Sequence, residues 1–430
     1  VRDEDGEYVR YPMFPETMYY SPFADQDAIY DDKTRSAYTS AYADIKLPVK
    51  GLTYRANFGY SYRHRETGQY WGSTTRTGEP VGGKAEVKDY TDGDWTWENI
   101  LRYDNTWGKH HLDLTGLYSA QETYKKEHFS TGQDFLSDHN SYHNIDMAQG
   151  IKTIESDKQN TAMLSWMLRA NYSFDRRYLL TLTGRRDGFS AFGEGNNKWA
   201  FFPAVAGAWV ISEESFFESA KDKVEFLKLR LSYGANGNLA VKAYQTKTQL
   251  AQRDYIYGND ADYGIGLVSN FSRGNPNLKW ETTLSFNGGI DFNVFNNRLF
   301  GSFDYYVSNT KDLLMNRSVP VMNGYTTILD NVGKTRNTGF DITLNSMNVK
   351  TGDFQWNSTF VLSGNWSKIT ALREDGLVVI TNYWFIGKPI GVHYDYKVVV
   401  LWQEDAAEEM ANTKYWGKNP FAGAAYLQDA

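Results

Sequence analysis

The stretch GLTYRANFGYSYRHR, residues 51–65, decides the fold class, because its residues alternate strictly in character. One set of alternate positions is apolar or aromatic: Leu52, Tyr54, Ala56, Phe58, Tyr60 and Tyr62. The intervening set is polar, charged or glycine: Thr53, Arg55, Asn57, Gly59, Ser61 and Arg63. Successive side chains of a β-strand point to opposite faces, so the stretch predicts a strand with one apolar and one charged face.

The same alternation recurs along the chain in residues 161–175, 279–295, 337–346 and 353–369. We expect about a dozen such strands, many of them roughly 10 to 17 residues long, against about 5 to 6 for an ordinary globular strand. A tilted strand needs about 9 to 11 residues to cross a bilayer. The pattern therefore predicts an all-β fold, a transmembrane antiparallel β-barrel.

The connections between these segments differ in length. Short turns are predicted at residues 174–179 and 295–300, and long polar stretches at residues 65–93, 128–160, 236–278 and 310–335. Short turns at one end and long loops at the other are typical of outer-membrane barrels. A helix is also expected within residues 213–223, with Ser212 as its N-cap and lysines near its C-terminus.

The composition fits a wall between lipid and water. Aromatic residues make up 16% of the 430 residues, yet the mean hydropathy is −0.58. Trp and Tyr favour the headgroup layer, so we expect an aromatic belt from residues near strand ends. Its predicted members are Trp95, Trp97, Trp107, Tyr178, Trp199, Trp280, Trp356 and Trp366.

Charge and cysteine usage exclude several functions. The net charge of −7 offers no basic surface for nucleic acid, and the absence of cysteine excludes disulfides and thiolate chemistry. Residues 137–143 offer Asp138, His139 and His143 to a metal, and residues 24–32 are acidic, but exposed loops are the favoured interpretation of both. We predict no metal and no cofactor.

Catalysis is not expected either. Carboxylates on the polar strand faces could form a glycosidase pair, but they are more simply interpreted as lumen lining. These carboxylates are Glu281, Asp291, Asp304 and Asp341. The sequence lacks the common catalytic motifs, and we predict that the protein is not an enzyme.

Residues 185–217, RRDGFSAFGEGNNKWAFFPAVAGAWVISEESFF, add a resemblance. They resemble a signature of the SusC/RagA family of TonB-dependent outer-membrane transporters, in which an R-x-D-G turn leads to N-N-x-W and then to F-P and W-x-I-S-E-E. The matching residues include Asp187, Gly188, Asn197, Trp199 and Pro203. We expect the aromatic residues here to be belt and wall residues, and the Gly/Asn cluster to be a bend between strands.

Further motifs of that family follow in order. Residues 227–238 resemble L-K-L-R-x-S-Y-G-x-T-G-N, and residues 274–315, which include Trp280, resemble its N-P-x-L-K-W-E-T strand pair. Residues 331–344 and 387–398 continue the resemblance, and residues 48–60 also fit. Phe189 stands where the family usually has Ser.

The resemblance implies one portion of a 22-stranded barrel. We expect residues 1–430 to be a partial outer-membrane β-barrel domain, with the N-terminal plug and the final C-terminal strands outside this chain. Open sheet edges are not tolerated in lipid, so the portion needs the remaining strands to close.

The resemblance also implies TonB-dependent uptake of large nutrients, oligosaccharides first and peptides second, across the outer membrane of a Gram-negative bacterium. The implied partners are a SusD-like surface lipoprotein as lid, the TonB complex and outer-membrane lipid. Predicted substrate contacts are polar lumen residues and loop aromatics: Arg55, Arg63, Arg169, Asn287, Tyr70, Trp71, Tyr383 and Trp384.

Two alternatives from other classes stay open at this point. A passive porin or structural barrel protein would also have two-faced strands. A soluble, aromatic-rich carbohydrate-binding β protein would have shorter strands and would be extracted without detergent.

Overall fold

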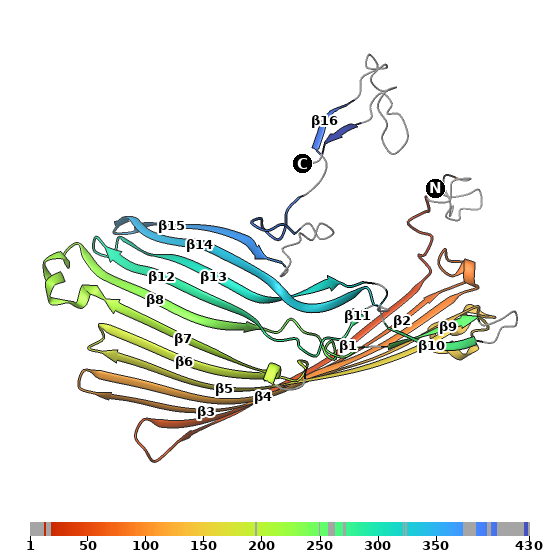
Figure 1. Cartoon of the computed structure of the whole chain (residues 1–430), viewed down its shortest axis with the longest axis horizontal. Helices are drawn as coiled ribbons and strands as arrows, with labels where there is room; N and C mark the ends of the chain where they lie inside the picture. Colours follow the sequence, from red (N-terminus) through yellow and green to blue (C-terminus); the bar gives the residue numbers. More distant parts are fainter. Residues whose placement is uncertain are drawn as a thin grey trace.

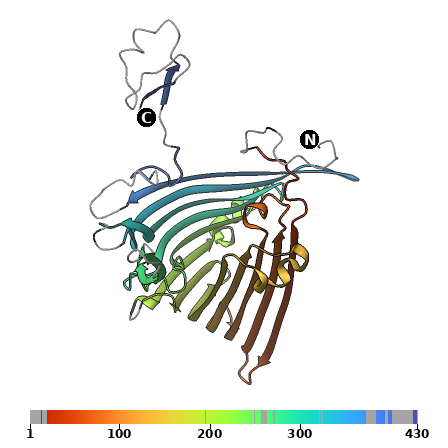
Figure 2. The ribbon, with the colours of Figure 1, turned by 90° about the vertical axis from the view of Figure 1, so that its right-hand side faces the viewer.

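The protein is described here by a computed structural model, whose main feature is one curved antiparallel sheet that forms an open trough (Figure 1, Figure 2). The structure describes residues 13, 19–193, 196–248, 250–256, 263–269, 272–320, 322, 325–372, 384–393, 397–401 and 425–428. The sheet has 13 strands in the order β1-β2-β3-β4-β5-β6-β7-β8-β12-β13-β14-β11, with β15 also paired to β14.

Its long strands run from 12 residues in β6 to 25 in β14, which confirms the predicted all-β class and the expected dozen strands. They are β1 (Ile29–Lys46), β2 (Leu52–Trp71), β3 (Lys84–Trp107), β4 (His110–Gln133), β5 (Lys152–Phe174), β6 (Tyr178–Phe189), β7 (Trp199–Val210), β8 (Val224–Asn238), β12 (Glu281–Val294), β13 (Leu299–Ser318), β14 (Thr327–Thr351) and β15 (Phe354–Ala371).

The remaining elements are short. The other strands are β9 (Leu250–Ile256), β10 (Tyr263–Ser269), β11 (Ser272–Arg273), β16 (Lys397–Leu401) and β17 (Ala425–Gln428). The 3-10 helices are η1 (Glu79–Val81), η2 (Asp138–His143), η3 (Ile145–Met147), η4 (Asn196–Lys198), η5 (Ile211–Glu213) and η6 (Ser215–Ala220). In the described part of the chain, no helix has the length and apolar character needed to cross a membrane.

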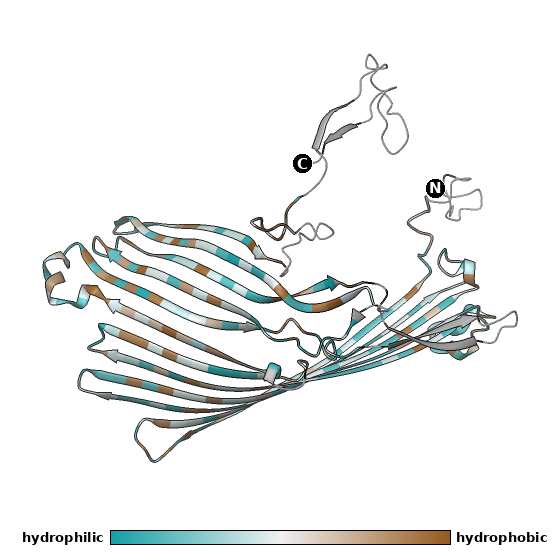
Figure 3. Ribbon diagram, viewed as in Figure 1, coloured by the Kyte–Doolittle hydropathy of each residue, from teal (hydrophilic) through white to brown (hydrophobic). Residues whose placement is uncertain are grey.

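The register gives the sheet two different faces. Residues directly opposite on neighbouring strands share a face, and Phe58 lies opposite Trp97 while Tyr118 lies opposite Trp166. We call this the apolar face. The other is the polar face, on which Asp304 lies opposite Asp341. Brown and teal residues accordingly alternate along the strands (Figure 3).

The two ends of the sheet differ as predicted. On what we call the turn side, strands are joined by residues 47–51, 108–109, 175–177, 295–298 and 352–353, and by the longer connection 211–223. Asp175 and Arg176 at φ 52° and 56°, and Gly108 at φ 57°, supply the left-handed backbone that such tight turns need. The other end, the loop side, carries the connections 72–83, 134–151, 190–198, 239–280 and 319–326.

The predicted long loops were too long. Much of residues 65–93 and 128–160 is strand, because β2 to β5 continue far beyond their apolar rows with polar residues on both faces. Backbone pairing alone sustains a ladder there, so the polar composition misled the prediction. Similarly, β13 and β14 occupy most of residues 310–335.

The predicted helix was also wrong in form. Residues 211–220 form two 3-10 helices, and the Ser212 side chain is fully buried and makes no cap hydrogen bond. Glu214 makes tertiary contacts instead of stabilising a helix N-terminus. Its carboxylate accepts hydrogen bonds from Tyr178 Oη at 2.5 Å and Trp209 Nε1 at 3.0 Å. These contacts hold the segment against β6 and β7 instead of continuing an α-helix.

Candidate substrate-facing wall

The polar face carries arginines that are paired across strands. Arg55 donates two hydrogen bonds to Asp44, both at 2.5 Å. Arg230 on β8 bridges Asp291 on β12 at 2.8 Å and Asp304 on β13 at 3.0 Å. The Arg55 pair is exposed and contributes little to stability, while the Arg230 bridge is half-buried. Both place charged groups on this face and make it hydrophilic. Its character suits a water-filled lumen.

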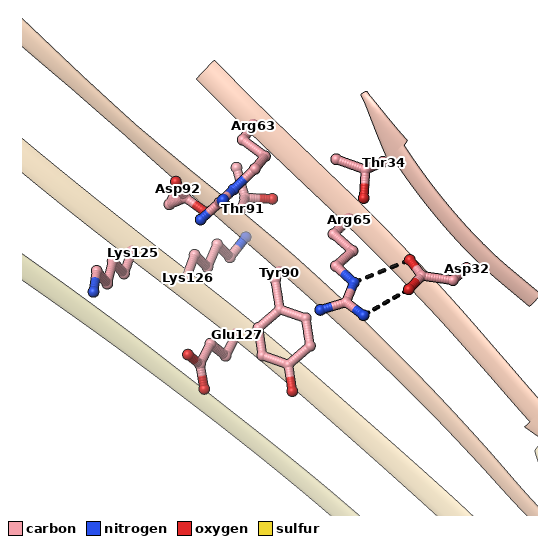
Figure 4. A pocket seen from close by; sticks show the side chains of 10 residues that line it. All are labelled: Asp32, Thr34, Arg63, Arg65, Tyr90, Thr91, Asp92, Lys125, Lys126 and Glu127. Atoms are coloured by element: carbon pink, nitrogen blue, oxygen red, sulfur yellow. Dashed lines mark hydrogen bonds and ion pairs between the residues drawn. The ribbon is translucent and has the colours of Figure 1, made fainter. Parts of the chain in front are cut away.

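A charged pocket lies on this face towards the loop side, on strands β1 to β4 (Figure 4). Its volume is about 420 Å³. Arg65 donates to the two Asp32 carboxylate oxygens at 3.0 and 2.6 Å, and Arg63 Nη2 lies 2.9 Å from Asp92. The lining residues are Asp32, Thr34, Arg63, Arg65, Tyr90, Thr91, Asp92, Lys125, Lys126 and Glu127.

The electrostatics of the pocket hold its charges in place. The two hydrogen bonds from Arg65 fix the Asp32 carboxylate beside the guanidinium group. Lys125 and Glu127, by contrast, have no ion-pair partner among the described residues. Lys126, which also lines the pocket, has no ion-pair partner among these residues either. The pocket therefore offers two free ammonium groups and one free carboxylate beside two fixed guanidinium groups. This arrangement can bind charged or hydroxyl groups, and it lacks a nucleophile held by a base.

Beyond the pocket, the connection 134–151 folds back onto the strand ends. Tyr70 and Phe135 meet edge to edge at 5.5 Å in a small apolar cluster with Ala85 and Ala148. Asp138 accepts hydrogen bonds from Tyr70 Oη at 2.7 Å, and from the Ser73 amide and hydroxyl. The connection is thus a packed structure.

The family-motif residues build a second packed structure, which we call the motif knot. Trp280 stacks on Phe192 at 5.2 Å and meets Phe202 at 5.6 Å, and its Nε1 donates to the Lys198 carbonyl at 3.1 Å. All three rings are less than a tenth exposed. The buried members are Ala191, Phe192, Phe202, Ala235, Val241, Leu278, Trp280 and Leu329.

The motif knot corrects two expectations. Trp280 and the phenylalanines 192 and 202 are not belt residues, because Phe202 lies on the polar face opposite Arg185, and residues 190–193 and 274–280 fold over it. Glu281 is not free lumen lining either: it is 6% exposed and accepts hydrogen bonds from Asn238 and the Leu314 amide. The bend predicted from the Gly/Asn cluster is confirmed, because β6 ends at Phe189 and β7 begins at Trp199, with η4 (Asn196–Lys198) just before it.

The other motif residues have structural partners. Asp187 is 5% exposed and accepts two hydrogen bonds from Arg185, at 2.9 and 2.8 Å. A Cβ on Gly188 would lie 2.3 Å from the Trp199 ring, so only glycine fits there. Pro203 lies opposite Gly184 on the apolar face, and Asn197 lies in η4.

The predicted substrate residues are scattered. Arg55, Arg63, Arg169 and Asn287 all lie on the polar face, but only Arg63 lines the charged pocket. Arg169 donates to Thr183 Oγ1 at 3.2 Å, and Asn287 lies opposite Ser232 and Tyr306. Substrate contact by these four stays a prediction.

The loop aromatics are differently placed. Tyr70 is 2% exposed, so its ring offers no free face to a sugar. Trp71 is half-buried between Tyr30 and Lys84, and Trp384 lines an apolar cavity of about 140 Å³ beside Leu313 and Ile390. Tyr383 lies outside the described residues.

Arg65, Asp32 and Tyr90 were missed from the sequence. Arginines two residues apart on one strand face, in residues 63–65, were a visible signal. The carboxylates that complete the pocket come from neighbouring strands, and that register was not readable from the sequence.

Metal-ligand geometry is sparse in the described part of the chain. His64, Glu66 and Asp89 bring ligand atoms within 4.8 Å of one another. However, His64 Nε2 already faces Glu66 at 3.1 Å and its Nδ1 faces Thr91 at 3.0 Å, while Arg35 also pairs with Glu66. These hydrogen bonds explain the group without an ion.

Comparison with known proteins decides the family. The family model "TonB dependent receptor-like, beta-barrel" matches residues 3–430. This chain belongs to the TonB-dependent receptor family. The receptor's sheet is accordingly a portion of a transmembrane β-barrel, with its apolar face towards lipid and its polar face towards the lumen. The family is one of outer-membrane receptors and transporters, and not of enzymes.

Individual relatives agree. The receptor is 32% identical over 354 residues to TonB-dependent receptor P3 of Formosa agariphila, covering 82% of this chain and 35% of that protein. It is 34% identical over 218 residues to TonB-dependent receptor SusC of Bacteroides thetaiotaomicron, covering 49% and 21%. The RagAB peptide transporter structure matches with a TM-score of 0.80 at 24% identity, covering 99% of this chain and 48% of that one.

These matches bear on the earlier alternatives. The structural match shows the same fold, and the chain spans about a third of the length of P3 and a fifth of that of SusC. The SusC/RagA resemblance is confirmed by the family model and the named relatives. The long strands and the family exclude the soluble carbohydrate-binding alternative.

Proposed function

We propose that this receptor forms part of the wall of an outer-membrane importer that takes up large nutrients by TonB-dependent active transport in a Gram-negative bacterium. The observation that carries the proposal is the two-faced sheet, whose polar face combines paired arginines with an open charged pocket. A wall of this kind keeps a hydrated path next to lipid and has hydrogen-bonding groups directed into that path.

The substrate class follows from the resemblance and from the pocket chemistry. We propose oligosaccharides as the first candidate and peptides as the second, with polar-face residues making the contacts. Arg63, Arg65, Lys125 and Glu127 suit substrates that carry charged groups or many hydroxyls. The similarity to a peptide transporter keeps peptides in consideration.

The partners belong to the same proposal. The whole protein would contain a plug and further strands beyond this portion of barrel, and the TonB complex would act through the plug. A SusD-like surface lipoprotein would close the lumen from the loop side, which faces outward in this fold.

Uptake by cells that express the full-length protein together with a SusD-like lipoprotein tests the proposal. Labelled oligosaccharides and peptides of graded length would be supplied with and without a protonophore. We expect saturable uptake that the protonophore abolishes. Uptake that survives the protonophore would instead establish a passive pore, and no uptake of either class would contradict the proposed substrates.

A further inference from the structure

The apolar face ends very differently at its two edges. On the loop side, the row beyond Tyr62 and Tyr124 contains Arg35, His64, Thr91, Lys126 and Lys158, one residue from each of β1 to β5. The row itself contains no carboxylate. Glu66 in the next row pairs with Arg35 and faces His64, so the two lysines are the cations of this row that have no ion pair among the described residues. The row spans about 19 Å, at about 4.8 Å per strand step.

Two directly opposed pairs of like charge stand out. Lys126 lies opposite Lys158 on β4 and β5, and Arg336 lies opposite Lys368 on β14 and β15. All four residues are exposed, and none of them forms an ion pair within the described part of the chain. Like charges directly opposite one another destabilise a sheet, so each pair costs stability unless an anion lies between the two cations.

Both pairs lie just beyond aromatic residues at the loop-side edge of the apolar face. Trp366 lies opposite Thr338, in the row immediately before Arg336 and Lys368, and it is 62% exposed. Tyr124 precedes Lys126 by one position on the same face. In a barrel, exposed aromatic rings mark the headgroup layer, so the cations next to them lie at the depth of headgroup phosphates.

The turn-side edge of the same face lacks such residues. Its outermost positions on β3 to β7 and β15 are mostly aromatic, and the described register places no Lys or Arg among them. They are Trp107, His110, Phe174, Tyr178, Trp209 and Phe354. If cations were placed beyond the apolar face only to keep the protein in contact with water, they would be expected at both edges of that face. The opposed cations instead lie at the loop-side edge.

We infer that Lys126, Lys158, Arg336 and Lys368 form a collar that binds the phosphate groups of lipid headgroups in the outer leaflet. The ligand is a phosphorylated glycolipid, because loop-side residues face the outer leaflet and a single phosphate can neutralise two opposed cations. The collar lies on the outside of the barrel. Lys126 also borders the charged pocket, whereas Lys158, Arg336 and Lys368 do not, so these three residues test the collar separately from the proposed transport activity.

Lipid binding by the full-length receptor tests the collar. The triple variant Lys158→Gln, Arg336→Gln, Lys368→Gln would be compared with wild type and with Lys46→Gln, Lys50→Gln, Lys350→Gln. The second triple removes the same charge from the exposed turn side. Delipidated protein in neutral detergent would be titrated with lipopolysaccharide, with phosphatidylcholine and with inorganic phosphate, and bound lipid counted by native mass spectrometry.

Each basic residue near an anionic membrane surface contributes about fivefold in affinity. We therefore expect the collar variant to bind lipopolysaccharide at least about tenfold more weakly, and the turn-side variant to bind it like wild type. Phosphatidylcholine binding should not distinguish the three proteins.

Equal loss in both triple variants, or no loss in either, would overturn the inference. So would competition by inorganic phosphate at concentrations equal to the lipid, since that would indicate a general anion site. Retained heat-modifiable migration in gel electrophoresis would show that each variant is folded, so that a loss of binding is not a loss of the barrel.

Discussion

The polar face of this receptor is organised differently in its two halves. On β1 to β4 its loop-side part remains open, with a pocket of about 420 Å³ between ion-paired arginines. On β6 to β14 the corresponding part is filled by the motif knot, in which Phe192, Phe202 and Trp280 are buried together. The comparison teaches that the recognisable motif residues are used for packing, while the groups available to a substrate lie elsewhere.

Truncation inside the motif knot should have the largest effect on stability. Trp280→Ala removes a 5% exposed ring and its hydrogen bond to the Lys198 carbonyl, and should lower the free energy of unfolding by about 3–5 kcal/mol. Unfolding of the full-length protein in lipid measures this. The control Trp356→Ala removes a 55% exposed ring and should cost clearly less. Equal losses would show that the knot is no more important than the exposed belt.

A smaller effect on stability is expected at Gly193, where the motif knot has no room for a Cβ atom. A Cβ on Gly193 would lie 1.9 Å from the Pro276 carbonyl oxygen, so Gly193→Ala must displace backbone. We expect a destabilisation of about 1–3 kcal/mol, as for overpacked cores. The matched control is Gly59→Ala on the open polar face, where nothing lies within 4 Å and little change is expected. A neutral Gly193→Ala would show that the two loops do not pack as described.

The connection 134–151, which packs on the loop-side ends of the strands, gives a third, local effect. Tyr70→Phe deletes the hydrogen bond to Asp138 but keeps the buried ring, and should cost about 1 kcal/mol. Amide hydrogen exchange should become faster in residues 134–151 and stay unchanged in the motif knot. Tyr38→Phe, at a 76% exposed position, serves as control. Unchanged exchange in residues 134–151 would argue that this hydrogen bond does not hold the connection.

The smallest stability change, with the largest expected change in uptake, belongs to the pocket. Arg65→Gln removes an exposed pair with Asp32 and should change stability by at most about 1 kcal/mol. Uptake of charged substrates should nevertheless weaken, chiefly through a higher KM, because the fixed guanidinium is lost. Lys46→Gln on the turn side is the control for charge alone. Unaltered uptake by Arg65→Gln would remove the pocket from the transport path.

The strands and the packed connections between them were not equally predictable from the sequence. The alternation in residues 52–63 predicts the strand and its faces correctly, because side-chain period depends only on local backbone geometry. The burial of Trp280 was missed, since it depends on residues 190–193 and 274–280 meeting across the sheet. Tyr70 was expected at a substrate surface for the same reason: the connection that covers it lies more than sixty residues away in sequence.

The charged pocket could be predicted from the sequence only in part. Arg63 and Arg65 could be placed on one face, but the carboxylates that pair with them, Asp92 on β3 and Asp32 on β1, depend on the register of those strands. Register follows from turn geometry and loop length over the whole hairpin. A shift by one residue would place every one of these charges on the lipid side.

The central claim is that this register puts one face towards lipid and the other towards water, and site-directed spin labelling tests it most directly. The chain contains no cysteine, so single cysteines at successive positions 284–291 of β12 can be labelled cleanly. In liposomes, oxygen accessibility should peak at 284, 286 and 290, and accessibility to a nickel chelate should peak at 285, 287 and 291. Two profiles that rise and fall together, without a period of two, would contradict the account.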